Sequence, residues 1–190
     1  MIVQRTHKRY NLVVKNFSLK FVDIMVGIVL GLGFQWWPAL TEPWQYIVFV
    51  FAYLDIVDYW IDYSPSLKKF PPKREIDIFL DIGIMFAMFL YIYTTQLTVV
   101  HFFSAFVLWR IFDYFWLLSS RHEFRPTGVD RIFVNTWLHV NILEGCVTLV
   151  LIGATYLMPL APIIWITVFC TFRIVVRVFA SSRYKKAHFV

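Results

Sequence analysis

Six long apolar stretches, separated by short polar segments, constrain this chain more than any other feature. Each has the roughly 20 mostly apolar residues that an α-helix needs to cross the hydrocarbon core of a bilayer. The stretches cover residues 18–37, 44–63, 76–94, 99–119, 132–157 and 163–182. We therefore expect an all-α integral membrane protein with six transmembrane helices, in which residues 1–190 form a single transmembrane domain.

The composition fits a membrane protein better than a soluble one. Hydrophobic residues make up 59% of the 190 residues and charged residues only 16%, whereas soluble domains have about 45–50% and about 25%. Cys146 and Cys170 lie inside apolar stretches, so a disulfide framework is not indicated. The stretch that ends at Trp37 follows a basic segment, as in a signal peptide. It has no small-residue cleavage site, however, and we interpret it as a retained span.

Basic residues gather in every second connection. They lie before residue 21 and in segments 67–74, 121–131 and 183–186. The other three turns, 38–43, 94–98 and 158–162, contain no Lys or Arg. Positively charged loops stay in the cytoplasm, so this alternation predicts that both termini are cytoplasmic in a cell membrane, either the bacterial inner membrane or its equivalent. No basic face is left over for nucleic acid, and the expected partner is the lipid bilayer.

Charged residues inside the apolar stretches are the second unusual feature. A charge at this depth is costly and normally faces the interior of a helix bundle, so each one is a candidate for function. The spacing of Asp55, Asp58 and Asp62 places all three on one face of a helix. The intramembrane polar network predicted here consists of Asp55, Asp58, Asp62, Asp77, Asp81, Arg110, Asp113, Glu144, Arg173 and Arg177.

Two interpretations of this network stay open for any single residue. The three arginines could pair with carboxylates and only hold the helices together. The acids outnumber them, however, so some acids must be protonated, hydrated or bound to a cation. Glu144 is the strongest functional candidate, because it lies near the middle of its stretch without a partner in its own helix.

The first apolar stretch carries two adjacent stripes at helical spacing. One stripe predicts close packing against another helix, since small residues allow close approach; it consists of Asp23, Gly27 and Gly31. The neighbouring stripe is apolar with one polar end, and we predict that it lines a pore at the centre of a homo-oligomer. Its residues are Ile24, Ile28, Leu32 and Gln35.

Residues 21–23 (Phe-Val-Asp), followed by Gly27-Ile28 and Leu32, resemble the Phe-Ser-Asp motif on the first helix of the transmembrane protein 175 family of potassium channels. The resemblance implies an oligomeric cation channel in which the first helix lines the pore. The apolar constriction of that family falls at the position of Ile28. A ring of apolar side chains can gate a pore by dewetting.

The resemblance extends over three helices. Tyr59-Trp60 resembles the Tyr-Trp pair of that family, and Asp81 falls where the family carries a polar Asn. The chain departs from the family at Val22, where a Ser is expected, and at Tyr63, where a His is expected.

An enzyme is a further interpretation. Asp55, Asp58, Asp77 and Asp81 resemble the four aspartates of CDP-alcohol phosphotransferases, which implies Mg²⁺ as a cofactor that bridges to phosphates. That family has a Gly after the second aspartate, where this chain has Tyr59. The aspartate spacing on the second stretch also resembles that of prenyltransferases of the UbiA type. Outside this interpretation we expect no catalytic residue, no metal and no cofactor.

The remaining interpretation is a membrane sensor or anchor subunit that works with a cytoplasmic protein partner. In size and character the chain resembles the small multi-span subunits of bacterial antiviral defence systems, such as the membrane protein of Kiwa. The inner loops would then be the docking surface. We rank the channel first, the partnered subunit second and the enzyme third.

Overall fold

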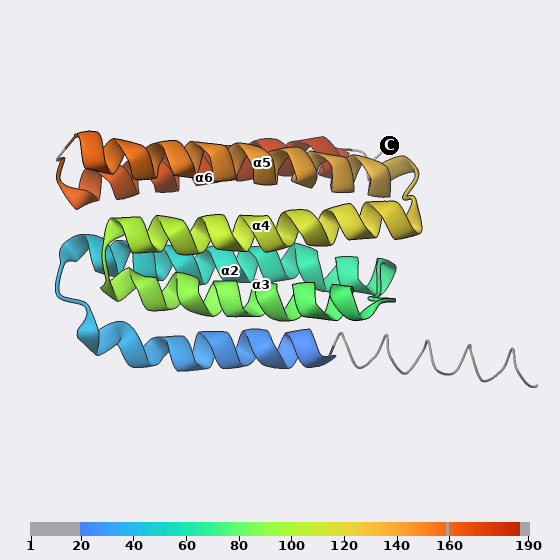
Figure 1. Ribbon diagram of the computed structural model, residues 1–190, viewed down its shortest axis with the longest axis horizontal. Coiled ribbons are helices and arrows are strands. Elements are labelled where there is room, and N and C mark those ends of the chain that lie inside the picture. Colours follow the sequence, from blue (N-terminus) through green and yellow to red (C-terminus); the bar gives the residue numbers. More distant parts are fainter. Residues whose placement is uncertain (1–19, 159, 187–190) are drawn as a thin grey trace, which may run out of the picture.

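The computed structural model describes residues 20–158 and 160–186 as a bundle of long, roughly parallel and antiparallel helices, with no strand in these ranges (Figure 1). The first helix (residues 20–33) continues into the short helix η1 (Phe34–Ala39). It is followed by α2 (Pro43–Lys69), α3 (Glu75–Tyr93), η2 (Thr94–Gln96), α4 (Val99–Phe124), α5 (Gly128–Leu157) and α6 (Pro162–Lys186). The all-α class is confirmed.

Five of these helical segments are long and apolar enough to cross a membrane. They are Lys20–Ala39, Glu75–Gln96, Val99–Phe124, Gly128–Leu157 and Pro162–Arg183. Helix α2, which carries three aspartates, is not among them, although it has 27 residues and runs alongside the others (Figure 1). Six spans therefore stay a prediction.

Several helices extend further than their apolar stretches predict. Helix α2 continues to Lys69 and α4 to Phe124, about a turn or more beyond the ends of the corresponding stretches. Hydropathy detects only the apolar, lipid-compatible part of a helix. The helix can continue into the polar layer, where its residues need not be apolar. Pro65 lies inside α2, where it removes one backbone N–H from the hydrogen-bond pattern of the helix.

The connections are fixed by local hydrogen bonds. Before α2, the side chain of Gln45 accepts hydrogen bonds from the backbone N–H groups of Thr41 and Glu42, at 2.7 and 3.0 Å. Between α4 and α5, Arg125 adopts a left-handed conformation with φ 44°, and Gly128 has φ 55°. Such backbone angles allow a sharp reversal, so α4 and α5 run antiparallel in direct contact.

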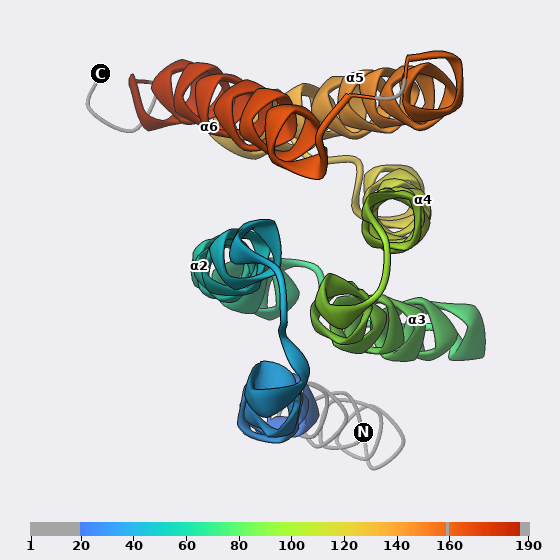
Figure 2. The same cartoon turned by 90° about the vertical axis from the view of Figure 1, so that its left-hand side faces the viewer.

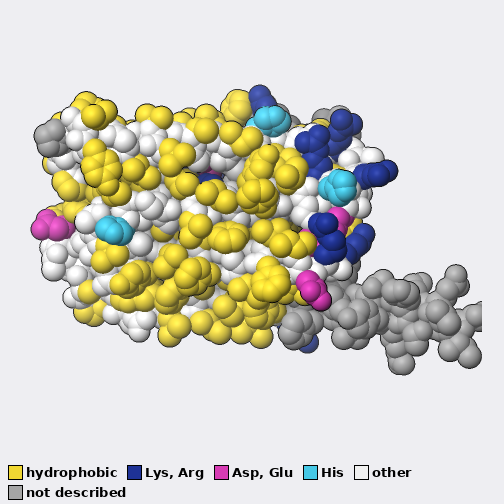
Figure 3. All heavy atoms as spheres, in the orientation of Figure 1, with side chains coloured by type: hydrophobic (Ala, Val, Ile, Leu, Met, Phe, Trp, Pro, Cys, Tyr) yellow, Lys and Arg dark blue, Asp and Glu magenta, His cyan; other side chains and the backbone are white. Residues whose placement is uncertain are grey.

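Figure 2 shows the order of the helices across the bundle. The first helix lies at one edge, α2 and α3 form the next layer, and α5 and α6 lie together on the far side with α4 beside them. Lys and Arg side chains gather at the end of the bundle where α2 and α4 end and where α3 and α5 begin (Figure 3). We call this the basic end and the other the apolar end.

Candidate functional site

A chain of buried charges joins four helices at the centre of the bundle. Glu144 on α5 has no exposed surface. Its Oε1 accepts a hydrogen bond from Arg173 Nη1 of α6 at 2.6 Å, and its Oε2 lies 3.3 Å from Arg110 Nη1 of α4. Arg173 also pairs with Asp55 of α2 at 2.9 Å. The predicted candidate Glu144 is thus shared by two arginines from other helices.

Asn141, one turn before Glu144 on α5, connects this centre to a third carboxylate. Its side-chain nitrogen donates to Asp113 Oδ2 at 2.7 Å, and its oxygen lies 3.3 Å from Arg110 Nη1. The hydroxyl of Tyr59 donates to the other oxygen of Asp113 at 2.6 Å. Asp113 is therefore held by two neutral donors.

Arg110 is only 1% exposed and is incompletely hydrogen-bonded. Its Nε and Nη2 have no partner among the described residues. Its guanidinium carbon lies 4.2 Å from the ring centre of Trp109 and 5.0 Å from that of Phe106. Aromatic faces stabilise a buried cation, so rings replace part of the missing hydrogen bonding.

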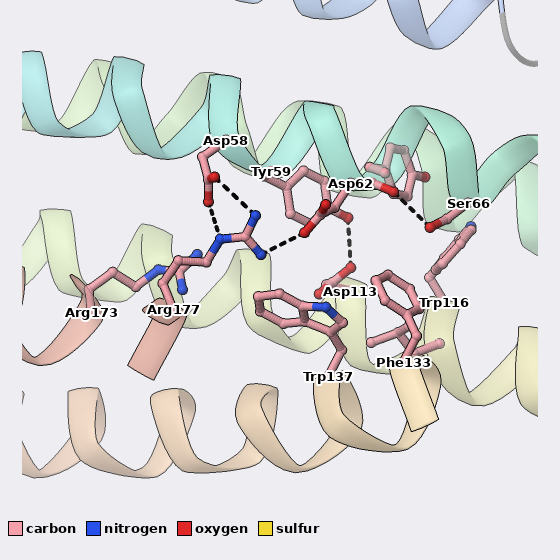
Figure 4. A pocket seen from close by; sticks show the side chains of 12 residues that line it. Asp58, Tyr59, Asp62, Ser66, Asp113, Trp116, Phe133, Trp137, Arg173 and Arg177 are labelled. Carbon is pink, nitrogen blue, oxygen red and sulfur yellow. Dashed lines mark hydrogen bonds and ion pairs between the residues drawn. The ribbon is translucent and has the colours of Figure 1, made fainter. Parts of the chain in front are cut away.

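The three aspartates of α2, which the spacing places on one helix face, all bind arginines of α6. Asp55 binds Arg173, while Asp58 and Asp62 bind Arg177. Arg177 Nη1 lies 2.6 Å from Asp62 Oδ2, and its Nη2 donates to Asp58 Oδ1 at 2.9 Å (Figure 4). One arginine thus serves two carboxylates on the inward face of α2.

Asp77 and Asp81 of α3 belong to other local arrangements. Asp77 accepts a hydrogen bond from Ser119 at 2.6 Å and others from the backbone N–H groups of Lys73 and Arg74, so it caps the start of α3. Asp81 accepts a hydrogen bond from the hydroxyl of Tyr63 at 2.5 Å. Within the described ranges, no three His, Cys, Asp or Glu side chains are grouped closely enough to hold a metal ion.

A small cavity of about 30 Å³ lies beside this network, between α2, α4, α5 and α6 (Figure 4). Its polar wall contains Asp58, Asp62, Asp113 and Arg177, and its apolar wall is mainly aromatic. A cavity needs about 10–15 Å³ to hold one water molecule and needs polar groups to bind it. This one has both, and we call it the acidic cavity.

A second cavity of about 120 Å³ lies next to it, toward the basic end. The two share the wall residues Asp62, Ser66 and Phe133. Pro65 and the ion pair between Lys69 and Asp130 border the second cavity on the side of the basic end. The second cavity therefore lies between the acidic cavity and the basic end.

Carboxylates exceed arginines in this part of the bundle. Its carboxylates are Asp55, Asp58, Asp62, Asp81, Asp113 and Glu144, and its arginines are Arg110, Arg173 and Arg177. Unneutralised charge is expensive away from bulk water. Among the described residues the acids thus outnumber the arginines, and protons, water or a bound cation could offset the difference.

The two predicted stripes of the first helix lie on the outside of a single chain. Gly27 and Gly31 are exposed and have open space around them. Asp23 accepts a hydrogen bond from Trp60 Nε1 at 3.0 Å but is also exposed. The helix packs on the bundle through a different face, formed by Val22, Val26 and Val29.

The apolar stripe is exposed in the same way. Ile24 is 61% exposed, Ile28 44% and Leu32 48%, and Gln35 is exposed as well. Close packing of the glycines and pore lining by the isoleucines both require a second copy of the chain, and both stay predictions.

Sequence reasoning missed the neutral polar groups that bind the predicted acids. These are Tyr59, Tyr63, Ser119 and Asn141. Asn141 could have been predicted, since it is an amide in an apolar stretch and lies three residues before Glu144. The three hydroxyl groups could not, because hydroxyl groups are common in membrane helices.

Comparison with known proteins gives no match to a family model, to a curated protein or to a solved structure. Function is therefore inferred from the site alone.

Proposed function

We propose that this chain is a multi-pass membrane protein that moves cations, protons included, and that they enter from the basic end into the acidic cavity. The observation that carries the proposal is the excess of carboxylates over arginines beside a cavity large enough for water. A cation placed there would offset the negative charge of Asp113, which is held by neutral donors. Buried carboxylates of this kind mark ion and proton pathways in membrane proteins.

The orientation is part of the proposal. Helix α2 joins the five apolar helices as a sixth span, and the basic end with both termini faces the cytoplasm. The support is the segregation of Lys and Arg to one end of the bundle (Figure 3) together with the preference of basic loops for the cytoplasm. Cations would then reach the acidic cavity from the cytoplasm.

Flux measurements test the transport proposal. Purified protein in liposomes should carry Rb⁺ or protons down an imposed gradient, measured by isotope uptake or by an enclosed pH-sensitive dye. Asp113→Asn should lower the flux at least tenfold, because it removes a cavity charge while keeping shape. The matched control is Glu75→Gln, an exposed carboxyl at the start of α3 outside the cavity. Wild-type flux in Asp113→Asn would overturn the proposal.

A pore along the first helix of an oligomer is the second candidate. The favouring observation is that this helix uses one face for the bundle and leaves both predicted stripes uncovered. Ile28→Asn should then wet the constriction and raise cation leak in planar-bilayer recordings. The control is Ile47→Asn, a comparably exposed position on α2. Equal leak in both variants would exclude a special role for the first helix.

Cysteine labelling tests the orientation. In a chain whose two native cysteines are replaced, an impermeant maleimide added outside intact cells should label a cysteine at position 41. It should leave a cysteine at position 73 unlabelled until the cells are opened. External labelling of position 73 would overturn the six-span arrangement.

A further inference from the structure

A long groove lies on the outer surface between α5 and α6, with a volume of about 540 Å³. On α5 it extends from Ile132 to Leu143, which is about 16 Å at the helical rise of 1.5 Å per residue. Val175 and Phe179 of α6 form the facing wall and are more than half exposed. The groove thus runs along the expected direction of the lipid chains.

The groove is not purely apolar. Asn135, Thr136 and His139 line its α5 side. Nδ1 of His139 contacts the backbone oxygen of Asn135 at 2.6 Å, which leaves the other ring nitrogen for a partner outside the chain. The Thr136 hydroxyl can donate a hydrogen bond to an ester oxygen of a lipid, and the remaining nitrogen of a neutral His139 can accept one from a headgroup hydroxyl. An acyl chain alone can do neither.

Positive charge marks only one end of the groove. Arg183 lines it at the basic end, where its guanidinium lies 4.5 Å from the ring centre of Phe179. Arg131 lies one helical turn before Asn135 on α5 and is exposed. Neither arginine has a carboxylate partner within the described part of the chain. A negatively charged group at this end would therefore find two unpaired cations.

We propose that this groove binds one anionic phospholipid, with an acyl chain along α5 and α6 and the phosphate at Arg183 and Arg131. Charge complementarity carries the assignment, because the arginines lie at the end of the bundle that meets the headgroup layer. A zwitterionic lipid would fit the walls equally well but would gain less from the two arginines. The inference is independent of the transport proposal, since the groove shares no residue with the acidic cavity.

Native mass spectrometry of the purified, detergent-solubilised protein tests the assignment. Equal amounts of phosphatidylglycerol and phosphatidylcholine with matched acyl chains are added, and bound lipid is counted per chain. Wild type should retain phosphatidylglycerol preferentially. Arg183→Gln and Arg131→Gln should each weaken its binding about fivefold, since a basic residue near the headgroup contributes about this factor.

Two further variants separate this groove from general attraction to the basic end. Arg121→Gln removes an exposed charge at the end of α4, outside the groove, and should leave phosphatidylglycerol binding unchanged. Val175→Trp should fill the exposed groove and reduce binding of both lipids. Equal binding of the two lipids by wild type, equal losses in the Arg121 and Arg183 variants, or full retention by Val175→Trp would each overturn the proposal.

Discussion

The two halves of the bundle differ in the polar interactions that accompany their aromatic packing. Toward the apolar end, rings from several helices pack on one another, with Tyr91 and Phe102 at 4.6 Å and Phe106 and Phe169 at 4.9 Å. Toward the basic end, ion pairs and hydrogen bonds link α2, α4, α5 and α6 around a cavity. Close apolar packing excludes ions, whereas the region around the cavity has charged groups that water can contact.

The comparison teaches that the two halves should respond differently to the loss of a side chain. A ring in the apolar half contacts several other rings, so the loss of one contact leaves the others in place. In the basic half, Arg173 pairs with carboxylates of two helices, and Arg177 pairs with two carboxylates of α2, so one substitution there changes the balance of several groups. We expect side-chain deletions to have sharply different effects in the two halves.

The largest effect is expected for Arg173→Ala. It would leave Asp55 and Glu144 buried without their common partner, and breaking a buried pair costs about 3–5 kcal/mol. Thermal unfolding in detergent should show a large fall in Tm or a loss of folded protein. The control Arg183→Ala, an exposed arginine on the same helix, should change Tm little. Similar falls in Tm for both variants would show that the pairing of Arg173 with Asp55 and Glu144 stabilises the fold no more than an exposed arginine does.

Two tyrosines compare the halves directly. The hydroxyl of Tyr59 donates to Asp113 at 2.6 Å, so Tyr59→Phe should cost about 1.5–3 kcal/mol. The hydroxyl of Tyr91 is buried without a hydrogen-bond partner in the described chain. Tyr91→Phe should therefore be neutral or stabilising in the same unfolding measurement. A larger loss for Tyr91→Phe would contradict the division into a polar half and a packed half.

Glycine substitutions test how tightly the helices fit. A methyl group added at Gly83 of α3 would lie 2.6 Å from the ring of Phe112 on α4, so Gly83→Ala should destabilise by about 1–3 kcal/mol. The same change at Gly145 of α5 meets open space and should stabilise by up to about 1 kcal/mol through helix propensity. Unfolding curves that move in the same direction for both would show that the contact between α3 and α4 is loose.

The smallest loss of single-chain stability is expected for Gly27→Leu. The position has open space, so the monomer should not be destabilised and should gain at most about 1 kcal/mol from helix propensity. A loss of oligomer in crosslinking or light scattering would then report a contact with a second copy. An unchanged oligomer, or a protein that is monomeric in any case, would count against the glycine stripe as an interface.

Helices could be predicted from the sequence, but partners could not. A bilayer demands long apolar segments, so each of the six apolar stretches indicated a long helix, and five of these helices are also apolar enough to count as candidate spans. Pairing depends on the depth and rotation of every helix, which a single sequence does not encode locally. Arg110 and Asp113 share a face of α4, yet Arg110 binds Glu144 while Asp113 binds Tyr59, and Asn141 bridges the two.

Pro65 has a mechanical consequence. It borders the hollow between the acidic cavity and the basic end, in the last turns of α2. Because it supplies no backbone N–H, that part of α2 has one hydrogen bond fewer to resist bending. The Ser66 hydroxyl donates to the Asp62 carbonyl at 2.7 Å and ties this turn to the cavity wall. The rate of water exchange with the cavity would then depend on the bending of one helical turn. It would not require the displacement of a whole helix.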